Sequence, residues 1–263
     1  MPFDFANLRQ RTASAAVMAP LALVAVYLGG PVYALAVILC AGLGLREWLR
    51  LVAPVLDRNT AIFAYAGLAL AIAAAAWQPA INGILLGAIF TVVLFLLAAR
   101  KNKERAAWIA FGLPYLAGSG IALVYLRGLE TNGATVFYLL AVVWSTDIGA
   151  YLSGKLIGGP KLAPAISPNK TWAGLLGGMA LAAIFGPLVA MGFGSTHPLG
   201  AAGFALLLAV AAQFGDFFKS YFKRRAGVKE SGGLIPGHGG VLDRIDGLIF
   251  AAIVLALLGA IAG

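Results

Sequence analysis

The chain has 263 residues, of which 61% are hydrophobic and only 11% are charged, and its mean hydropathy is +0.92. Soluble domains carry about 25% charged residues, so this composition excludes an ordinary soluble globular protein. The formal net charge of +9 does not indicate nucleic-acid binding, because the basic residues fall in short segments between apolar runs. They are typical of topology signals and of attraction for anionic lipid or a phosphorylated substrate.

Repeated apolar runs of roughly 20 residues predict an all-α, polytopic membrane protein with about nine transmembrane helices. The expected spans, in chain order, are 13–28, 32–45, 61–77, 81–99, 107–126, 134–152, 172–193, 199–222 and 242–261. Arg9 and Arg11 precede the first run as in a signal peptide, but a second run follows almost at once, so we expect a retained first helix. Cys40 is the single cysteine and, within an apolar run, is expected to be an inert buried thiol.

We expect no separate soluble domain. The predicted division places spans one to four in residues 1–105 and a catalytic region of spans five to nine in residues 106–263. Two loops of the catalytic region, 153–171 and 223–242, are expected to be cytoplasmic.

The distribution of Lys and Arg predicts the orientation. If the N-terminus is inside, all four inner loops are rich in these residues, including the polar stretch 46–58, whereas the outer turns hold only Arg127. We therefore expect a cytoplasmic N-terminus, an outer C-terminus and a functional site on the cytoplasmic face.

The stretch 215–246 stands out because it places many ions and glycines between two apolar runs. Its charged residues are Asp216, Lys219, Lys223, Arg224, Arg225, Lys229, Glu230, Asp243, Arg244 and Asp246. Most of the remaining chain is poor in charge. This stretch is the predicted chemical site.

Two carboxylates are expected at membrane depth. Asp147 lies in an apolar span, where a charge is costly, so it needs a partner, a metal or a water-filled cavity; Tyr151, four residues on, shares its helix face. The alternative is a carboxylate that is simply solvated near a helix end. Asp216 shares a helix face with Ser220 and Lys223. The alternative here is a helix end that snorkels into headgroups, with Asp216 paired to Lys219 or Ser220.

The run from Pro236 to Asp246 combines a flexible loop with an acidic helix start. Gly237, Gly239 and Gly240 let backbone N–H groups approach an anion, and the dipole of the following helix favours phosphate at the same place. Asp243 and Asp246, three residues apart, project from one side of that helix. Facing Asp216 or Asp147, they would form an all-oxygen site suited to Mg²⁺. For Asp243 alone, acidic capping of the helix is the alternative.

Other polar residues add candidates. His238 suits a general base, a phosphate donor or a metal ligand, and a loop hydrogen bond is favoured over a zinc site. The loop before the seventh span has lysines and glycines suited to phosphate, although it lacks the GxxxxGK[ST] pattern. Its candidates, Ser167, Asn169 and Lys170, also fit a helix-entry turn.

Three motifs together resemble the CDP-diacylglycerol synthases, also called phosphatidate cytidylyltransferases. The first is SYFKR followed by Lys229, Glu230 and PGHGGVLDRID; the others are WSTDIGAY at 144–151 and SPNKT at 167–171, in the family's order. The resemblance covers roughly 144–249 in detail. It implies that CTP and phosphatidate give CDP-diacylglycerol and pyrophosphate, with Mg²⁺ and with a second cation left open. It further implies a homodimer embedded in the lipid of a bacterial inner (plasma) membrane. No nucleic-acid partner is expected, because the basic residues lie in short loops between apolar spans.

With this resemblance, the residues acquire expected roles. Asp216, Asp243 and Asp246 would bind metal, with Asp147 as a further candidate, while His238 and its glycines would shape the triphosphate loop. The expected phosphate contacts are Lys170, Lys223, Arg224, Lys229 and Arg244. Glu230 and Lys219 depart from the family pattern, which usually has Asp and Glu at these positions.

Two other functions fit parts of the pattern. A CTP-dependent polyprenol or phytol kinase also has many spans and a lipid acceptor. An ion-coupled transporter would use Asp147 and Asp216 as carriers near the bilayer midplane, but the charges gather at one face rather than along a path.

Overall fold

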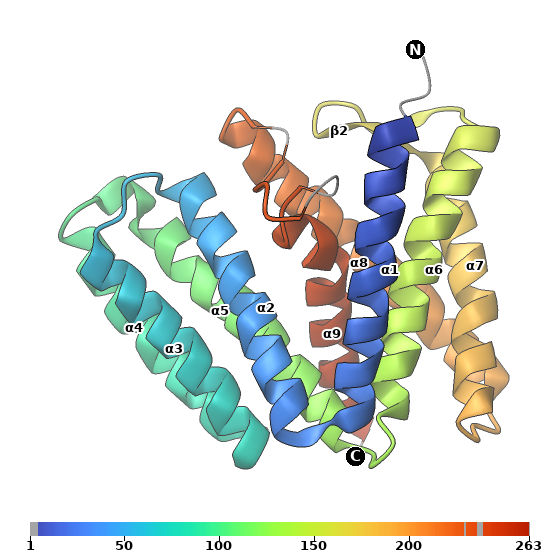
Figure 1. Ribbon diagram of the computed structural model, residues 1–263, viewed down its shortest axis with the longest axis horizontal. Helices are drawn as coiled ribbons and strands as arrows, with labels where there is room; N and C mark the ends of the chain where they lie inside the picture. The colour runs from blue at the N-terminus through green and yellow to red at the C-terminus, as the bar shows by residue number, and fades with distance from the viewer. Residues whose placement is uncertain (1–4, 229, 236–238, 263) are drawn as a thin grey trace. The chain divides into compact units, whose positions relative to one another are not determined.

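The computed structural model describes residues 5–228, 230–235 and 239–262, and these residues fold almost entirely as helices (Figure 1). The expected all-α membrane architecture is confirmed. Eight of the helices are long and apolar enough to cross a membrane, and the ninth, at the N-terminus, has a shorter apolar part, Ala16–Leu28. Some helices extend several residues past the expected apolar run, as Gly30–Val52 does, whereas others, such as Ala80–Ala99, end with the run.

The chain forms two compact units, which we describe separately. The first unit comprises residues 1–125 and 225–245, and the second comprises residues 126–224 and 246–263. The first contains α1 (Phe5–Leu28), α2 (Gly30–Val52), α3 (Arg58–Trp77), α4 (Ala80–Ala99) and most of α5 (Lys103–Gly128). The second contains α6 (Ala134–Leu156), β1 (Lys161–Ala163), β2 (Ser167–Thr171), α7 (Trp172–Gly192), nearly all of α8 (Pro198–Arg225) and most of α9 (Leu242–Ala262).

Trp48 anchors the core of the first unit. Its side chain is fully buried, and its ring lies 5.8 Å from that of Phe111 and 5.2 Å from that of Tyr115. The indole Nε1 donates to the carbonyl oxygen of Trp108 at 2.9 Å, so the polar end of the ring is satisfied inside the unit. This packing holds the end of α2 against α5.

The end of α2 differs from the expected inner loop. The polar stretch at 46–58 does not leave the helix at once, since α2 continues to Val52. Both Glu47 and Trp48 are buried. Packing against α5 stabilises this extra helical segment, although its charged residues suggested a loop.

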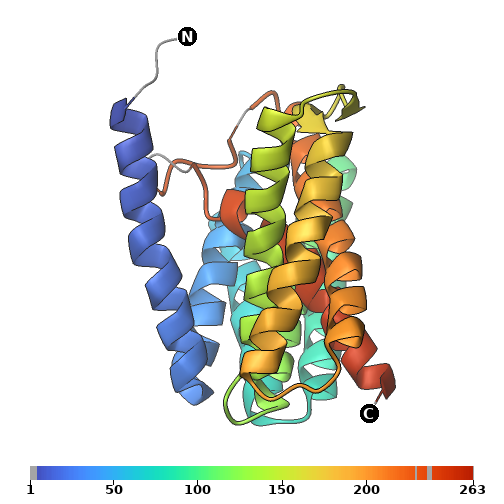
Figure 2. The same cartoon turned by 90° about the vertical axis from the view of Figure 1, so that its right-hand side faces the viewer.

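In the second unit, α6 and α7 pack along each other (Figure 2). The loop between them contains an antiparallel hairpin, β1–β2, which the sequence did not predict. Pro164 occupies the second position of its turn, and the amide of Ile166 donates to the carbonyl of Ala163 at 3.1 Å. Thr171 then caps α7 by accepting a hydrogen bond from the amide of Gly174 at 3.0 Å, as a helix-entry turn requires.

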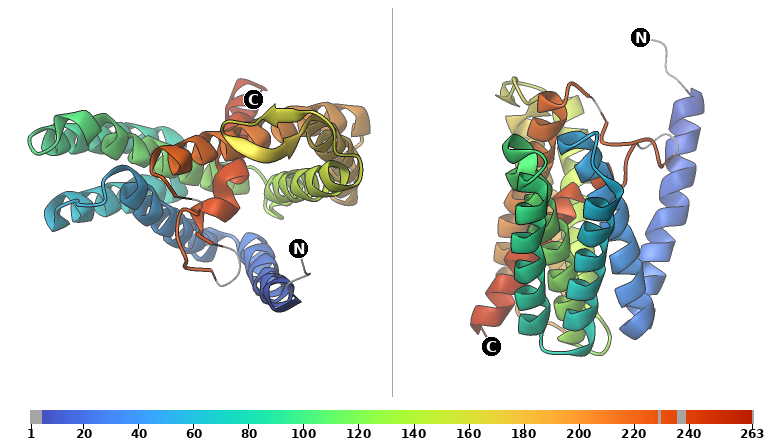
Figure 3. Two further views of the ribbon diagram at one scale, coloured as in Figure 1. Left: turned by 90° about the horizontal axis from the view of Figure 1, so that it is seen from above. Right: turned by 90° about the vertical axis from the view of Figure 1, so that its left-hand side faces the viewer.

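The hairpin is also bound to the end of α8 (Figure 3). Arg224 Nε donates to the carbonyl oxygen of Ile166 at 3.3 Å. The hairpin in the second unit therefore lies beside the end of α6, which precedes it, and the end of α8.

Large apolar side chains remain exposed on the outer faces of the helices, most of all on α4. Ile84, Leu85, Ile89, Val92 and Leu96 are all more than half exposed. Soluble proteins rarely expose such continuous apolar surface. A lipid-facing surface accounts for it.

Candidate functional site

A cavity of about 210 Å³ lies within the second unit, and predicted site residues line it. Its lining includes Asp147, Tyr151, Asn169, Lys170 and Asp216. These residues come from α6, the hairpin and α8, so the fold gathers side chains from three separate segments of the sequence. Gln213, which the sequence analysis did not single out, also lines the cavity.

Helix α6 supplies Asp147 and Tyr151. Asp147 lies nine residues before the last residue of the helix, Leu156, which is roughly 14 Å along the helix at 1.5 Å per residue. A carboxylate at that depth is costly in hydrocarbon, and lining a cavity is one of the ways to reduce the cost.

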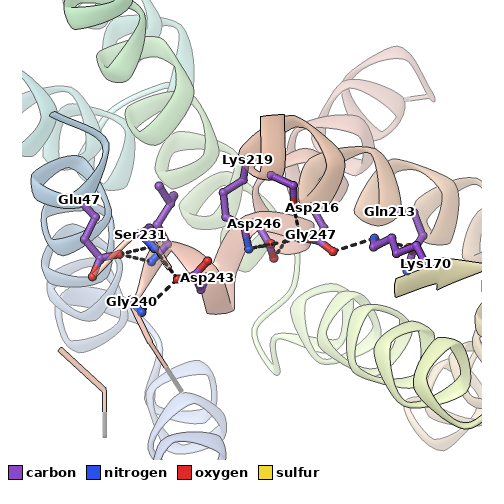
Figure 4. Close-up of polar contacts among 12 residues, drawn as sticks. Glu47, Lys170, Gln213, Asp216, Lys219, Ser231, Gly240, Asp243, Asp246 and Gly247 are labelled. Carbon is purple, nitrogen blue, oxygen red and sulfur yellow. Dashed lines mark hydrogen bonds and ion pairs between the residues drawn. The ribbon is translucent and has the colours of Figure 1, made fainter. Parts of the chain in front are cut away.

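Strand β2 supplies Lys170, whose ammonium group has two close polar partners. Its Nζ lies 2.7 Å from Oδ2 of Asp216 and 2.6 Å from Oε1 of Gln213. The same nitrogen lies 4.5 Å from the centre of the Phe217 ring. The ammonium is therefore held over one face of α8 in a defined place, as Figure 4 shows for its polar contacts.

Helix α8 supplies Asp216 and a second lysine, Lys219. The Nζ of Lys219 lies 3.3 Å from Oδ1 of Asp216, and Ser220 Oγ donates to the same oxygen at 3.4 Å. The pairing of Asp216 with Lys219 and Ser220, which was the alternative interpretation of this residue, is thus present. Asp216 nevertheless keeps 32% of its side chain exposed, so it is still accessible to a ligand.

The close approach of α8 and α9 brings Asp246 to the same lysine. A Cβ atom at Gly215 would overlap the carbonyl oxygen of Asp246, so glycine is needed there. Lys219 Nζ bonds Oδ2 of Asp246, and Lys219 is only 4% exposed (Figure 4). Two carboxylates, those of Asp216 and Asp246, therefore converge on one cation.

This arrangement fits a divalent metal ion with two protein carboxylates. Mg²⁺ with nucleotides is commonly held by one or two carboxylates together with substrate phosphates. Among the described residues, no three acidic, histidine or cysteine side chains form a ready metal site. Among the described residues, the pair Asp216 and Asp246 is therefore the candidate metal site.

Asp243 lies in the first unit, where it binds the loop before α9. Its Oδ2 accepts hydrogen bonds from the amide of Ser231 at 2.9 Å, from Ser231 Oγ at 2.8 Å and from the amide of Gly240 at 3.2 Å. These contacts correspond to the helix-start role that was the alternative for this residue. Its role as a metal ligand stays a prediction.

Glu47 is a second residue that the sequence analysis missed. It is 1% exposed and accepts hydrogen bonds from the amides of Val241 and Leu242. Ser231 Oγ lies 3.0 Å from its Oε2. The apolar period of Leu45, Trp48, Leu49 and Val52 continues past the expected end of the span, but it places Glu47 on the opposite face of the helix. Periodicity therefore gave no signal for Glu47, whose burial comes from remote residues of the chain.

The other predicted residues have different surroundings. Lys223 is half-buried on α8, Arg224 and Arg244 are exposed, and Ser167 pairs with Ala163 at the start of β2, outside the lining of the cavity. Gly239 and Gly240 are buried before α9. Lys229, Gly237 and His238 lie outside the described residues.

The chain matches the model of the cytidylyltransferase family over residues 9–262. It is 42% identical to a phosphatidate cytidylyltransferase of Brucella suis biovar 1 over 97% of this chain and 94% of the relative. It is 44% identical to one of Helicobacter pylori strain J99 over 64% of this chain and 61% of the relative. For one of Staphylococcus aureus strain COL, the identity is 38% over 69% of this chain and 71% of the relative. Since the match extends over nearly the whole sequence, the chain belongs to the cytidylyltransferase family.

Proposed function

We propose that the protein transfers the cytidylyl group of CTP to phosphatidate, which gives CDP-diacylglycerol and pyrophosphate. The similarity to phosphatidate cytidylyltransferases over nearly the full chain supports this reaction. The structural observation that carries it is the cavity where Asp147, Lys170 and Asp216 meet. Carboxylates and an ammonium group in one membrane-embedded cavity suit a reaction between two phosphates, one of them on a lipid.

The reaction is a displacement at phosphorus. A phosphate oxygen of phosphatidate forms a bond to the α-phosphorus of CTP, and the bond from that phosphorus to the oxygen bridging to the β-phosphate breaks. The electron pair of the broken bond leaves with pyrophosphate. Because phosphatidate is already ionised, no strong base is essential, and the protein mainly positions the phosphates and neutralises their charge.

We propose that Asp216 and Asp246, which share the ammonium group of Lys219, hold Mg²⁺. Asp216 lines the cavity together with Asp147. The cavity lining holds the carboxylates of Asp147 and Asp216 and the ammonium group of Lys170, so its formal charge is −1. A triphosphate would be repelled by that charge. A bound divalent ion would reverse its sign and would supply neutralisation of the charge that develops on pyrophosphate.

The basic residues are the proposed phosphate contacts. For Lys170, its position in the lining of the cavity and its exposed fraction of 18% support this role. Further proposed contacts, with the loop glycines and His238, are Lys223, Arg224, Lys229 and Arg244.

We further propose that the protein lies in the plasma membrane with its site toward the cytoplasm, as a homodimer. Support for the orientation comes from each unit separately. In the first unit, Lys101 pairs with Asp57 at 3.0 Å, which joins the loops that follow α2 and α4. In the second unit, Arg224 joins the end of α8 to the hairpin. The loops assigned to the inner face therefore gather at one end within each unit, while the homodimer rests on the family resemblance.

The reaction is tested with purified protein reconstituted with phosphatidate and labelled CTP. We expect label on the cytosine ring to appear in the lipid. Transfer of only the γ-phosphate label would identify a lipid kinase. Ion movement across vesicles without any CDP-lipid would identify a transporter.

The metal is tested in the same assay with Mg²⁺ present or removed by a chelator. We expect no turnover without Mg²⁺, and a loss of at least about 100-fold in Asp216→Asn, because one carboxylate ligand is removed. Asp57→Asn serves as the control, since it makes the same chemical change at a carboxylate outside the cavity. Chelator-resistant turnover, or full activity of Asp216→Asn, would exclude the proposed metal site.

A further inference from the structure

A buried carboxylate on α2 holds the backbone at the start of α9. Oε1 of Glu47 accepts from the amide of Val241 at 3.0 Å, and Oε2 accepts from the amide of Leu242 at 2.8 Å. Helix α9 begins at Leu242, so these amides belong to the helix start, where N–H groups have no partner within the helix. Glu47 therefore caps α9, although it lies 194 and 195 residues before the two amides that it binds.

Ser231 links Glu47 to Asp243. Its Oγ lies 3.0 Å from Oε2 of Glu47 and 2.8 Å from Oδ2 of Asp243. A hydroxyl carries one hydrogen, so it donates to one carboxylate at a time. Movement of Glu47 would therefore change the hydrogen bonding of Asp243, although the two carboxylates belong to distant parts of the sequence (Figure 4).

Two glycines provide the space for this carboxylate. A Cβ atom at Gly240 would overlap Oε2 of Glu47 and Oγ of Ser231, and one at Gly232 would come too close to Oε1 of Glu47. The need for glycine at these two positions thus has a local explanation. Of the described residues before α9, Gly232 and Gly240 therefore border the carboxylate of Glu47.

Burial of a carboxylate costs desolvation free energy, which an apolar side chain of the same volume would not. Apolar residues of similar volume commonly replace buried charges without loss of stability. The three groups that donate to Glu47, the amides of Val241 and Leu242 and the hydroxyl of Ser231, however, all belong to residues 231–242. That segment holds part of the family motif that ends in Asp243 and Asp246.

We propose that Glu47 is a positioning residue for the cytidylyl transfer reaction. It holds the loop before α9, and through Ser231 it sets the orientation of the Asp243 carboxylate. It is assigned no contact with substrate. This proposal rests on the proposed function, because the motif that Glu47 holds is the one expected to bind the nucleotide.

The direct test replaces Glu47 with glutamine, which has nearly the same size but offers one acceptor oxygen and an NH₂ group that cannot accept. We expect kcat/KM for CTP, expressed per folded molecule, to fall about 10- to 100-fold, as for other small displacements of reacting groups. Amide hydrogen exchange should become faster at Val241 and Leu242. The matched control is Glu104→Gln, the same change at an exposed residue of the same unit, and it should alter neither value.

A role in stability alone makes a different prediction. It would lower the amount of folded protein and leave kcat and the KM for CTP of the remaining folded molecules unchanged. Ser231→Ala separates the two roles, because it removes the link to Asp243 and leaves both amide contacts of Glu47 in place. We expect Ser231→Ala to lower kcat/KM, and the double variant with Glu47→Gln to lose less than the product of the two single effects.

Each outcome decides the proposal. Normal kcat/KM in both Glu47→Gln and Ser231→Ala, in a protein whose wild type makes CDP-lipid, overturns the positioning role and leaves the proposed function intact. If Glu47→Gln does not fold, Ser231→Ala alone decides in the same way. A wild type that makes no CDP-lipid overturns the proposed function, and the positioning role falls with it.

Discussion

The ammonium group of Lys219 bonds the carboxylate of Asp246, 27 residues further along the chain. Both side chains lie inside the second unit, and the same ammonium also contacts Asp216. Lys219 was noted in the sequence as a departure from the usual family residue, and the structure shows what this lysine contacts. It holds together two carboxylates that would otherwise repel each other.

Replacement of Lys219 by glutamine should destabilise the protein in the absence of Mg²⁺. Loss of one partner from a buried ion pair costs about 3–5 kcal/mol, because the remaining charges are left uncompensated. Mg²⁺ should restore part of the loss if Asp216 and Asp246 bind it. Thermal unfolding of detergent-solubilised protein, with Mg²⁺ and with a chelator, measures both effects.

Lys161→Gln is the control for this experiment, since Lys161 is an exposed lysine of the same unit. It should leave the unfolding temperature unchanged under both conditions. Equal stability of Lys219→Gln and the wild type in chelator would contradict the structural role assigned to Lys219.

Replacement of Lys170 by glutamine should weaken CTP binding. Its ammonium lines the cavity beside Asp216, and a hydrogen bond to a charged group contributes about 1.5–3 kcal/mol. We therefore expect the KM for CTP to rise roughly 10- to 100-fold. Steady-state assays with varied CTP at saturating phosphatidate measure this change. Lys161→Gln, on the same hairpin, should keep the wild-type KM, and an unchanged KM in Lys170→Gln would remove Lys170 from the phosphate contacts.

Replacement of Gly240 by alanine should displace Glu47. The added Cβ would overlap the Glu47 carboxylate and Ser231 Oγ, and overpacking of this kind costs about 1–3 kcal/mol. The loss in unfolding free energy should be smaller when Glu47 is already alanine, because the space is then vacant. Gly233→Ala is the control, since a Cβ at Gly233 meets no atom within 4 Å. Equal effects of Gly240→Ala with and without Glu47 would show that the two residues do not compete for space.

The helices were predictable because a membrane imposes a length and an apolar composition on each span. Leu45 was expected to end the second span, yet α2 continues to Val52 because Trp48 packs into the core. The hairpin escaped prediction since its strands are only three and five residues long and lie in a loop rich in proline and glycine. Local composition sets the spans, while packing decides what happens at their ends.

The candidate site was predictable in its residues and less so in their partners. The acids at 147 and 216 stood out because charges within apolar spans are rare, and both line the cavity. Asp243 and Asp246 were expected to act alike because they share one side of a helix. Their partners differ, with Ser231 for Asp243 and Lys219 for Asp246. Helix periodicity gives the direction of a side chain, whereas its partner comes from chain segments that are remote in the sequence.

The loop between α2 and α3 allows a test by pH. A hydrogen bond from the side chain of Thr60, the pairing with Lys101 and a hydrogen bond from the amide of Thr60 at 3.1 Å lower the pKa of Asp57 from 3.8 to about 2. Because the folded-state pKa lies below the unfolded value, the charged form contributes stability that is fully present above about pH 4. This contribution is lost as the pH falls toward 2.

Asp57→Asn keeps an oxygen that can cap α3 and loses the charge, so at pH 7 it should be slightly less stable than the wild type. In thermal unfolding, the difference in stability between the wild type and Asp57→Asn should narrow steadily as the pH falls from 4 to 2. At pH 7, Asp57→Ala should be less stable than both proteins by about 1 kcal/mol, because it loses the cap of α3. A wild-type advantage over Asp57→Asn that persisted unchanged at pH 2 would mean that the charge of Asp57 is not its source.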